Sequence, residues 1–134
     1  MTAFPLTIVT PDGPKFEGMV EELVVRTTTG DIGILAGHIN LVAALGMGRA
    51  TVICDGKKRY GACIGGMVSV MNGRVKLVPT SFEWAEDIDT GRAEASMERA
   101  KKTLNSKSSS DTDIRLAEAR LRRALVRKGV ASMK

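Results

Sequence analysis

The stretch that decides the fold is residues 50–78, ATVICDGKKRYGACIGGMVSVMNGRVKLV, which places two tight-turn signals between runs of strand-forming residues. Asp55-Gly56 and Asn72-Gly73 are dipeptides that accept the positive φ angles of two-residue hairpin turns. The residues on either side are rich in Val and Ile, as expected of short strands. This stretch therefore predicts two successive β-hairpins.

The same pattern extends towards the N-terminus. LTIVTPDG (residues 6–13) and VEELVVRT (residues 20–27) are further β-rich runs bounded by turn residues. Six or more short strands, with no helical pattern between them, are typical of a β-sandwich or a flattened barrel. We expect that domain to occupy residues 1–84.

Residues 85–134 change to a helical period. Apolar residues recur three or four positions apart in two stripes, as on one face of a helix. The first stripe is Ala93, Met97, Ala100 and Leu104, and the second is Ile114, Ala117, Leu121 and Leu125. A short polar link, NSKSSSDTD (residues 105–113), separates them. The sequence thus predicts an α+β protein whose sandwich is followed by an antiparallel two-helix hairpin.

Acidic residues precede each predicted helix. Asp87 or Asp89 is expected to cap the first helix, and Asp111 or Asp113 the second. Asp89 and Arg92 are one turn apart and are expected to pair. Both stripes are narrow and rich in Ala, which buries little area, so we expect the hairpin to dock weakly.

The positive charge is concentrated in the helical part. The net charge is +5, and residues 85–134 hold 12 bases against 8 acids, whereas residues 1–84 hold 8 against 7. A basic segment implies an acidic partner. No apolar run is long enough to span a membrane and no signal peptide is evident, so we expect a soluble protein. Cys54 and Cys63 lack metal-site spacing and are expected to be small core or sheet residues on successive strands, where they could be near neighbours.

Several motifs together resemble one family. VTPDGPKFEG (residues 9–18), GDIGILAGHINLVAAL (30–45), GGMVSV (65–70) and VKLV (75–78) occur in order. They are similar to motifs of the epsilon subunits of bacterial F-type ATP synthases, from about residue 5 to the end. In the second motif, Asp31 replaces the family's usual Glu and Ala36 its Pro.

The resemblance implies a noncatalytic subunit of the rotary motor, peripheral to the cytoplasmic face of the bacterial plasma membrane. Its sandwich would bind the gamma subunit and the c-ring, with Asp31, Gly33 and His38 in the contact region. Its hairpin would lie folded on the sandwich or extend towards the alpha and beta subunits. The extended hairpin would inhibit ATP hydrolysis by meeting an acidic stretch of beta with Arg115, Arg122, Arg123, Arg127 and Lys128.

The resemblance also implies regulation by ATP. Some members bind ATP in the folded hairpin through an Ile/Leu-Asp-x-x-Arg-Ala motif, which residues 88–93 match in full. Arg92 offers a fork of donors to phosphate oxygens. No glycine-rich phosphate loop or pair of metal-binding acids is evident, so we expect binding without hydrolysis, with a role for magnesium left open. The expected ATP-binding residues are Glu83, Ile88, Asp89, Arg92, Ala93, Arg99, Arg123 and Arg127, and Trp84 adjoins them.

Two alternatives come from other functional classes. The basic second helix is also expected of a nucleic-acid-binding module, although few aromatic residues are available for stacking on bases. An enzyme that uses Cys63 or His38 is the weaker alternative, because neither residue has an evident base or orienting acid.

Overall fold

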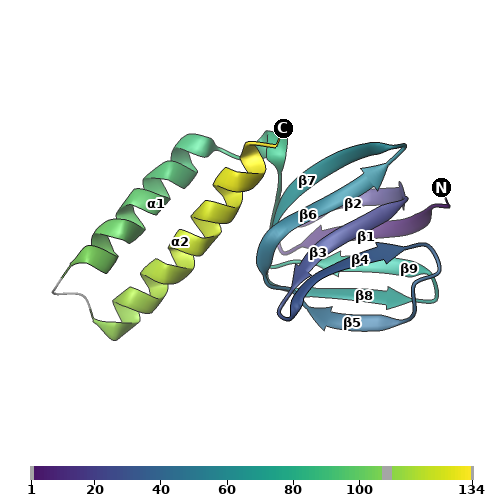
Figure 1. Cartoon of the computed structure of the whole chain (residues 1–134), viewed down its shortest axis with the longest axis horizontal. Helices are drawn as coiled ribbons and strands as arrows, with labels where there is room; N and C mark the ends of the chain where they lie inside the picture. Colours follow the sequence, from purple (N-terminus) through teal and green to yellow (C-terminus); the bar gives the residue numbers. More distant parts are fainter. Residues whose placement is uncertain (1, 107–109, 134) are drawn as a thin grey trace.

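The computed structural model describes residues 2–106 and 110–133, which form a β-sandwich with a helical hairpin beside it (Figure 1). The sandwich holds ten strands in two five-stranded sheets. The α+β prediction is therefore confirmed, and of the two predicted β architectures the structure has the sandwich and not the flattened barrel. One sheet has the order β2-β1-β9-β8-β5 and the other β10-β7-β6-β3-β4. The strands are β1 (Phe4–Thr10), β2 (Gly13–Val20), β3 (Glu22–Thr27), β4 (Gly30–Leu35), β5 (Leu41–Ala44), β6 (Met47–Cys54), β7 (Lys57–Ile64), β8 (Met67–Met71), β9 (Arg74–Val78) and β10 (Ser81–Trp84).

Both predicted hairpin turns are present. Asp55 and Asn72 have φ angles of 52° and 51°, and the glycines that follow them have 73° and 80°. Two successive positive φ angles are the signature of a type I′ turn, which matches the twist of the strands that it joins. The turns connect β6 to β7 and β8 to β9, the antiparallel pairs that the sequence predicted.

Alternate residues of the strands fill the space between the sheets. The inward positions carry mainly Val, Ile and Leu, and Ile8, Val25 and Leu77 are fully buried there. Aromatic residues gather at one end, where the Trp84 ring meets those of Phe16 and Phe82 edge-on, with centroids 6.1 and 4.9 Å away. This aromatic end supports β10, the last strand before the helices.

The two cysteines lie on successive strands, as expected, but they are not near neighbours. Cys54 pairs with Lys57 at the turn, whereas Cys63 pairs with Gly48 near the other end of the same two strands. Both are free thiols, Cys63 buried and Cys54 half-buried.

A short 3-10 turn, η1 (Ala85–Asp87), leads from β10 into α1 (Thr90–Asn105) and then α2 (Asp111–Ala131). Asp89 caps α1 as predicted, since its Oδ1 accepts from the backbone N–H of Arg92 at 3.0 Å. The cap of α2 is Ser110 and neither predicted aspartate. Asp113 instead completes a capping box, in which its carboxylate accepts from the Ser110 N–H while its own N–H donates to the Ser110 hydroxyl.

The apolar stripes are partly as predicted. Ala93, Met97 and Ala100 of α1 are buried, and so is Ala117 of α2. Leu125 was assigned to the buried stripe, but it is 51% exposed, and Ala124 takes the inward position beside it. The helix therefore turns a smaller side chain towards its neighbour, and the hairpin interior is even poorer in apolar area than the sequence indicated.

The hairpin meets the sandwich mainly through the end of α2, beside η1 and the linker that follows it (Figure 1). A small apolar cluster joins them there, which we call the seam: Ala62, Ala85, Ile88, Val130 and Ala131. Three of its five members are alanines, and the half-buried Tyr60 and Val126 pack against them. Such a small cluster buries a modest apolar area, which is consistent with weak docking.

Gly61 of β7 tests the packing of this end of the sandwich. A Cβ atom at Gly61 would overlap the buried ring of Phe82, whereas a Cβ at Gly33 of β4 would meet nothing within 4 Å. We expect Gly61→Ala to lower the free energy of unfolding by about 1–3 kcal/mol, the usual cost of overpacking. Gly33→Ala is the matched control and should stay near the wild type in urea denaturation. Equal stabilities of the two variants would contradict this packing.

The reactivity of the two thiols tests their environments. Burial raises the pKa of the Cys63 thiol to about 12, so at pH 8 it remains protonated and unreactive. Cys54 is half-buried, and its thiol donates to the carbonyl of Met19. We expect one thiol per native chain to react with a disulfide reagent at pH 8, and two in guanidinium chloride. Cys54→Ser should abolish the native reaction; a reaction that persists would show that Cys63 is accessible.

Candidate functional site

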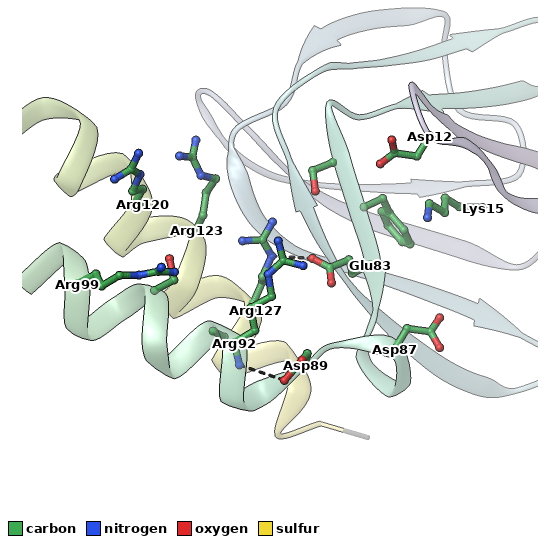
Figure 2. A pocket seen from close by; sticks show the side chains of 14 residues that line it. Asp12, Lys15, Glu83, Asp87, Asp89, Arg92, Arg99, Arg120, Arg123 and Arg127 are labelled. Carbon is green, nitrogen blue, oxygen red and sulfur yellow. Dashed lines mark hydrogen bonds and ion pairs between the residues drawn. The ribbon is translucent and has the colours of Figure 1, made fainter.

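A cavity of about 770 Å³ lies where the helical hairpin faces the β10 side of the sandwich (Figure 2). Side chains from the sandwich, the linker and both helices line it. They are Asp12, Lys15, Ser81, Phe82, Glu83, Asp87, Asp89, Arg92, Ala93, Ser96, Arg99, Arg120, Arg123 and Arg127. The volume falls in the range of small-molecule sites in proteins.

The cavity has a basic wall and an acidic wall. Arginines from both helices form the basic wall, and carboxylates from the sandwich and the linker form most of the other (Figure 2). Within residues 2–106 and 110–133, no ion pair neutralises five of the six lining cations: Lys15, Arg92, Arg99, Arg120 and Arg123. Several cations that converge without counter-charges favour an anionic ligand.

The sixth cation ties the two walls together. The Nε of Arg127 on α2 donates to Oε1 of Glu83 on β10 at 2.6 Å (Figure 2). Their side chains are 28% and 34% exposed. The pair thus closes the cavity beside the seam and joins the hairpin to the sandwich.

The start of α1 supplies the motif residues. Strand-like backbone at Asp89 lets its carboxylate cap the helix, and the first turn then carries Arg92 to the cavity (Figure 2). The predicted pair between Asp89 and Arg92 is made through the Arg92 backbone N–H rather than between the side chains. The Arg92 guanidinium is therefore left available to a ligand.

Seven of the eight residues expected to bind ATP line this cavity. The exception is Ile88, which is 5% exposed and packs in the seam. The others come from β10, the linker and both helices, and the fold brings them together: Glu83, Asp89, Arg92, Ala93, Arg99, Arg123 and Arg127.

Sequence reasoning missed other lining residues. Arg120 lies three residues before Arg123 and seven before Arg127, so helical spacing already placed it on their face. Asp12 and Lys15 stand about seventy residues before the motif, in the β1–β2 turn and on β2. No local sequence pattern indicates that these two residues line the cavity.

Trp84 faces away from the cavity, although its neighbour Glu83 lines it. Successive residues of a strand point to opposite faces, so the Trp84 ring enters the sandwich core and is 6% exposed. Its indole N–H donates to the backbone carbonyl of Lys15 at 3.2 Å, and the Arg59 guanidinium lies 3.8 Å from the ring centroid. Trp84 fluorescence would thus report a ligand only indirectly.

The five bases expected to form one inhibitory face do not share a face in this conformation. Arg115 and Arg122 are exposed, whereas Arg123 and Arg127 face the cavity. Lys128 pairs with Glu94 of α1 at 2.6 Å.

The residues expected to contact other subunits lie apart from the cavity, on β4 and the loop after it. The Asp31 side chain is 60% exposed and lies 3.7 Å from Arg26. Gly33 is exposed, and the His38 Nδ1 donates to the Ile39 carbonyl at 2.7 Å. No helix in the described part of the chain is long and apolar enough to cross a membrane.

Comparisons with known proteins agree over both parts of the chain. The family model "ATP synthase, Delta/Epsilon chain, beta-sandwich domain" matches residues 3–85, and its "long alpha-helix domain" matches residues 86–131. The chain is 44% identical to an ATP synthase epsilon chain of Bacillus velezensis over 98% of both chains. It is 46% identical to that of Bacillus subtilis over 86% of both.

Two solved structures share the fold. A chain of the Euglena gracilis mitochondrial ATP synthase superposes with a TM-score of 0.84 at 24% identity, over all of this chain and 83% of that one. A chain of the Tetrahymena thermophila mitochondrial ATP synthase central stalk and c-ring gives 0.63 at 13% identity, over 95% of both. These matches give no support to the nucleic-acid-binding alternative. The family models and the bacterial relatives confirm the resemblance found in the sequence: the chain belongs to the delta/epsilon chain family of ATP synthases.

Proposed function

We propose that the chain is the epsilon subunit of the central stalk of a bacterial F-type ATP synthase, without catalytic activity of its own. Full-length similarity to bacterial epsilon chains supports this assignment, as does the fold shared with a chain of a central stalk assembly. The sandwich binds the gamma subunit and the c-ring and helps to couple rotation. Asp31, Gly33 and His38 lie on a surface that the cavity leaves free for these contacts. The complex holds the subunit at the cytoplasmic face of the plasma membrane.

We further propose that the cavity binds ATP as a regulatory ligand when the hairpin is docked. The observation that carries this proposal is the convergence of unneutralised arginines from both helices on one cavity. Each guanidinium presents a planar fork of donors that suits phosphate oxygens. Without an anion, the packed helices hold these like charges close together, and their mutual repulsion opposes the folded hairpin.

The two ends of the nucleotide fit the two walls. The phosphates lie among Arg92, Arg99 and Arg123, where their charge is neutralised. Glu83 and Asp89 accept from the adenine amine or the ribose hydroxyls. The ligand thus offsets the repulsion among the arginines, contacts both sides of the cavity and stabilises the docked state.

Release of the hairpin would change the role of its bases. Arg123 and Arg127 leave the cavity and join Arg115, Arg122 and Lys128 as a basic surface for acidic groups near the alpha and beta subunits. Electrostatic attraction then holds the extended hairpin in a position that hinders ATP hydrolysis. Bound ATP opposes this step because it favours the docked hairpin.

ATP binding to the isolated chain tests the ligand. We expect calorimetry to show one site per chain, and Arg92→Gln to weaken ATP binding by roughly tenfold or more, because a charged hydrogen bond is lost. Arg115→Gln, which removes an exposed arginine outside the cavity, is the matched control and should bind like the wild type. Equal affinities of the Arg92→Gln variant and the wild type, or no binding at all, would refute the ligand.

Hydrolysis by the assembled complex tests inhibition. We expect a chain that ends at residue 87 to restore assembly when it replaces the full chain, and to raise ATP hydrolysis severalfold because the basic hairpin is missing. Raising the salt concentration should relieve inhibition by the full chain but leave the truncated complex unchanged. Equal hydrolysis rates in the two complexes would leave the subunit a coupling role and exclude inhibition by the hairpin.

A further inference from the structure

We propose that Lys15 of β2 is the phosphate contact on the sandwich side of the cavity, and that it makes nucleotide binding depend on a docked hairpin. This inference rests on the proposed binding of ATP. It adds a residue outside the motif and assigns it a separate task, which is to join the ligand to the sandwich.

Lys15 is distinguished by where it comes from. Among the described residues that line the cavity, every arginine belongs to α1 or α2, and Lys15 alone brings a positive charge from a strand of the sandwich (Figure 2). No ion pair in residues 2–106 and 110–133 involves its ammonium group. Its charge is thus available to a bound anion.

The position of Lys15 is set by the core. The Trp84 indole N–H donates to the Lys15 carbonyl, and the ring of the next residue, Phe16, meets Trp84 edge-on. Trp84 is itself held between Phe82 and the Arg59 guanidinium. These contacts anchor the backbone of β2 to β10, so the strand that carries Lys15 is fixed relative to the strand that carries Glu83. Trp84 is therefore a positioning residue for Lys15.

Linkage explains why a contact from the sandwich is needed. A ligand shifts a two-state equilibrium only by the difference between its affinities for the two states. Contacts with arginines of one helix can persist after the hairpin leaves the sandwich, so they contribute little to that difference. A phosphate contact with Lys15, like the proposed contact of Glu83 with the adenine or ribose, exists only in the docked state. The other charged groups of the sandwich in the cavity, Asp12 and Glu83, are acidic and repel phosphate.

Calorimetry on the full chain with ATP, at one fixed salt concentration, tests this role. We expect Lys15→Gln to weaken ATP binding by roughly tenfold and Lys15→Arg, which keeps the charge, to retain most of the affinity. Lys76→Gln is the matched control, because it removes an exposed lysine of the sandwich on β9, outside the cavity. It should bind ATP like the wild type.

Hydrogen exchange gives a second readout of the coupling. Saturating ATP should slow exchange at the end of α2 in the wild type, because docking covers Val130 and Ala131. In Lys15→Gln the same degree of saturation should give a smaller gain in protection.

Wild-type affinity in Lys15→Gln together with weakened binding in Arg92→Gln would overturn the role of Lys15 and leave the ATP site intact. Equal losses in Lys15→Gln and Lys76→Gln would also overturn it, since they would indicate only a long-range effect of charge. Absence of ATP binding to the wild type would remove both proposals.

A double-mutant cycle tests the positioning role of Trp84. Trp84→Phe keeps an aromatic ring in the core but loses the hydrogen bond to the Lys15 carbonyl. If Trp84 acts through Lys15, Trp84→Phe should weaken ATP binding in the wild type and have no further effect in Lys15→Gln. Additive losses in the two backgrounds would show that Trp84 acts independently of Lys15.

Discussion

The ion pair between Glu83 and Arg127, with the alanine-rich seam beside it, is the contact on which the rest of the site depends. The cavity has two walls only while this contact holds the hairpin on the sandwich. Both members of the pair are partly exposed, and such pairs contribute about 1 kcal/mol or less. The seam adds little, because alanine side chains remove little apolar surface from water. A small free energy therefore separates the docked hairpin from a released one.

The weakness of that contact gives a ligand its influence. A ligand that binds only the docked state, at a hundred times its dissociation constant, stabilises that state by about 2.7 kcal/mol. This exceeds the contribution expected of the ion pair, so the occupancy of the cavity would decide the position of the hairpin. A larger, leucine-rich seam would remove this sensitivity, because docking would then be complete without a ligand. The small residues at Ala62, Ala85 and Ala131 are thus consistent with a regulatory contact.

The sequence predicted the parts of the molecule that local chemistry determines. The Asp-Gly and Asn-Gly turns, the change of period after β10 and the Asp89 cap depend on residues close together in the chain, and all are present. It misplaced Leu125 because stripes assigned by spacing do not reveal which side chain the partner helix accepts. The predicted site did not include Lys15, because the approach of β2 to β10 depends on contacts between residues far apart in the sequence. The hydrogen bond from Trp84 to the Lys15 carbonyl is one of these contacts. The resemblance placed residues on both walls of the cavity, including Glu83 of the sandwich, but only the fold could add Asp12 and Lys15.

Arg123 and Arg127 connect the two proposed states. In the docked chain they face the cavity, and in an extended hairpin the same guanidinium groups would be available to acidic groups of neighbouring subunits. They cannot serve both at once, so the ligand and the acidic partner compete for the same side chains. Thermodynamic linkage makes this competition reciprocal: the factor by which ATP disfavours the extended contact equals the factor by which that contact weakens ATP binding. Under this proposal, the affinity for ATP is a property of the assembly as well as of the cavity. Its value in the isolated chain sets the upper limit, because no partner is then present to draw the arginines away.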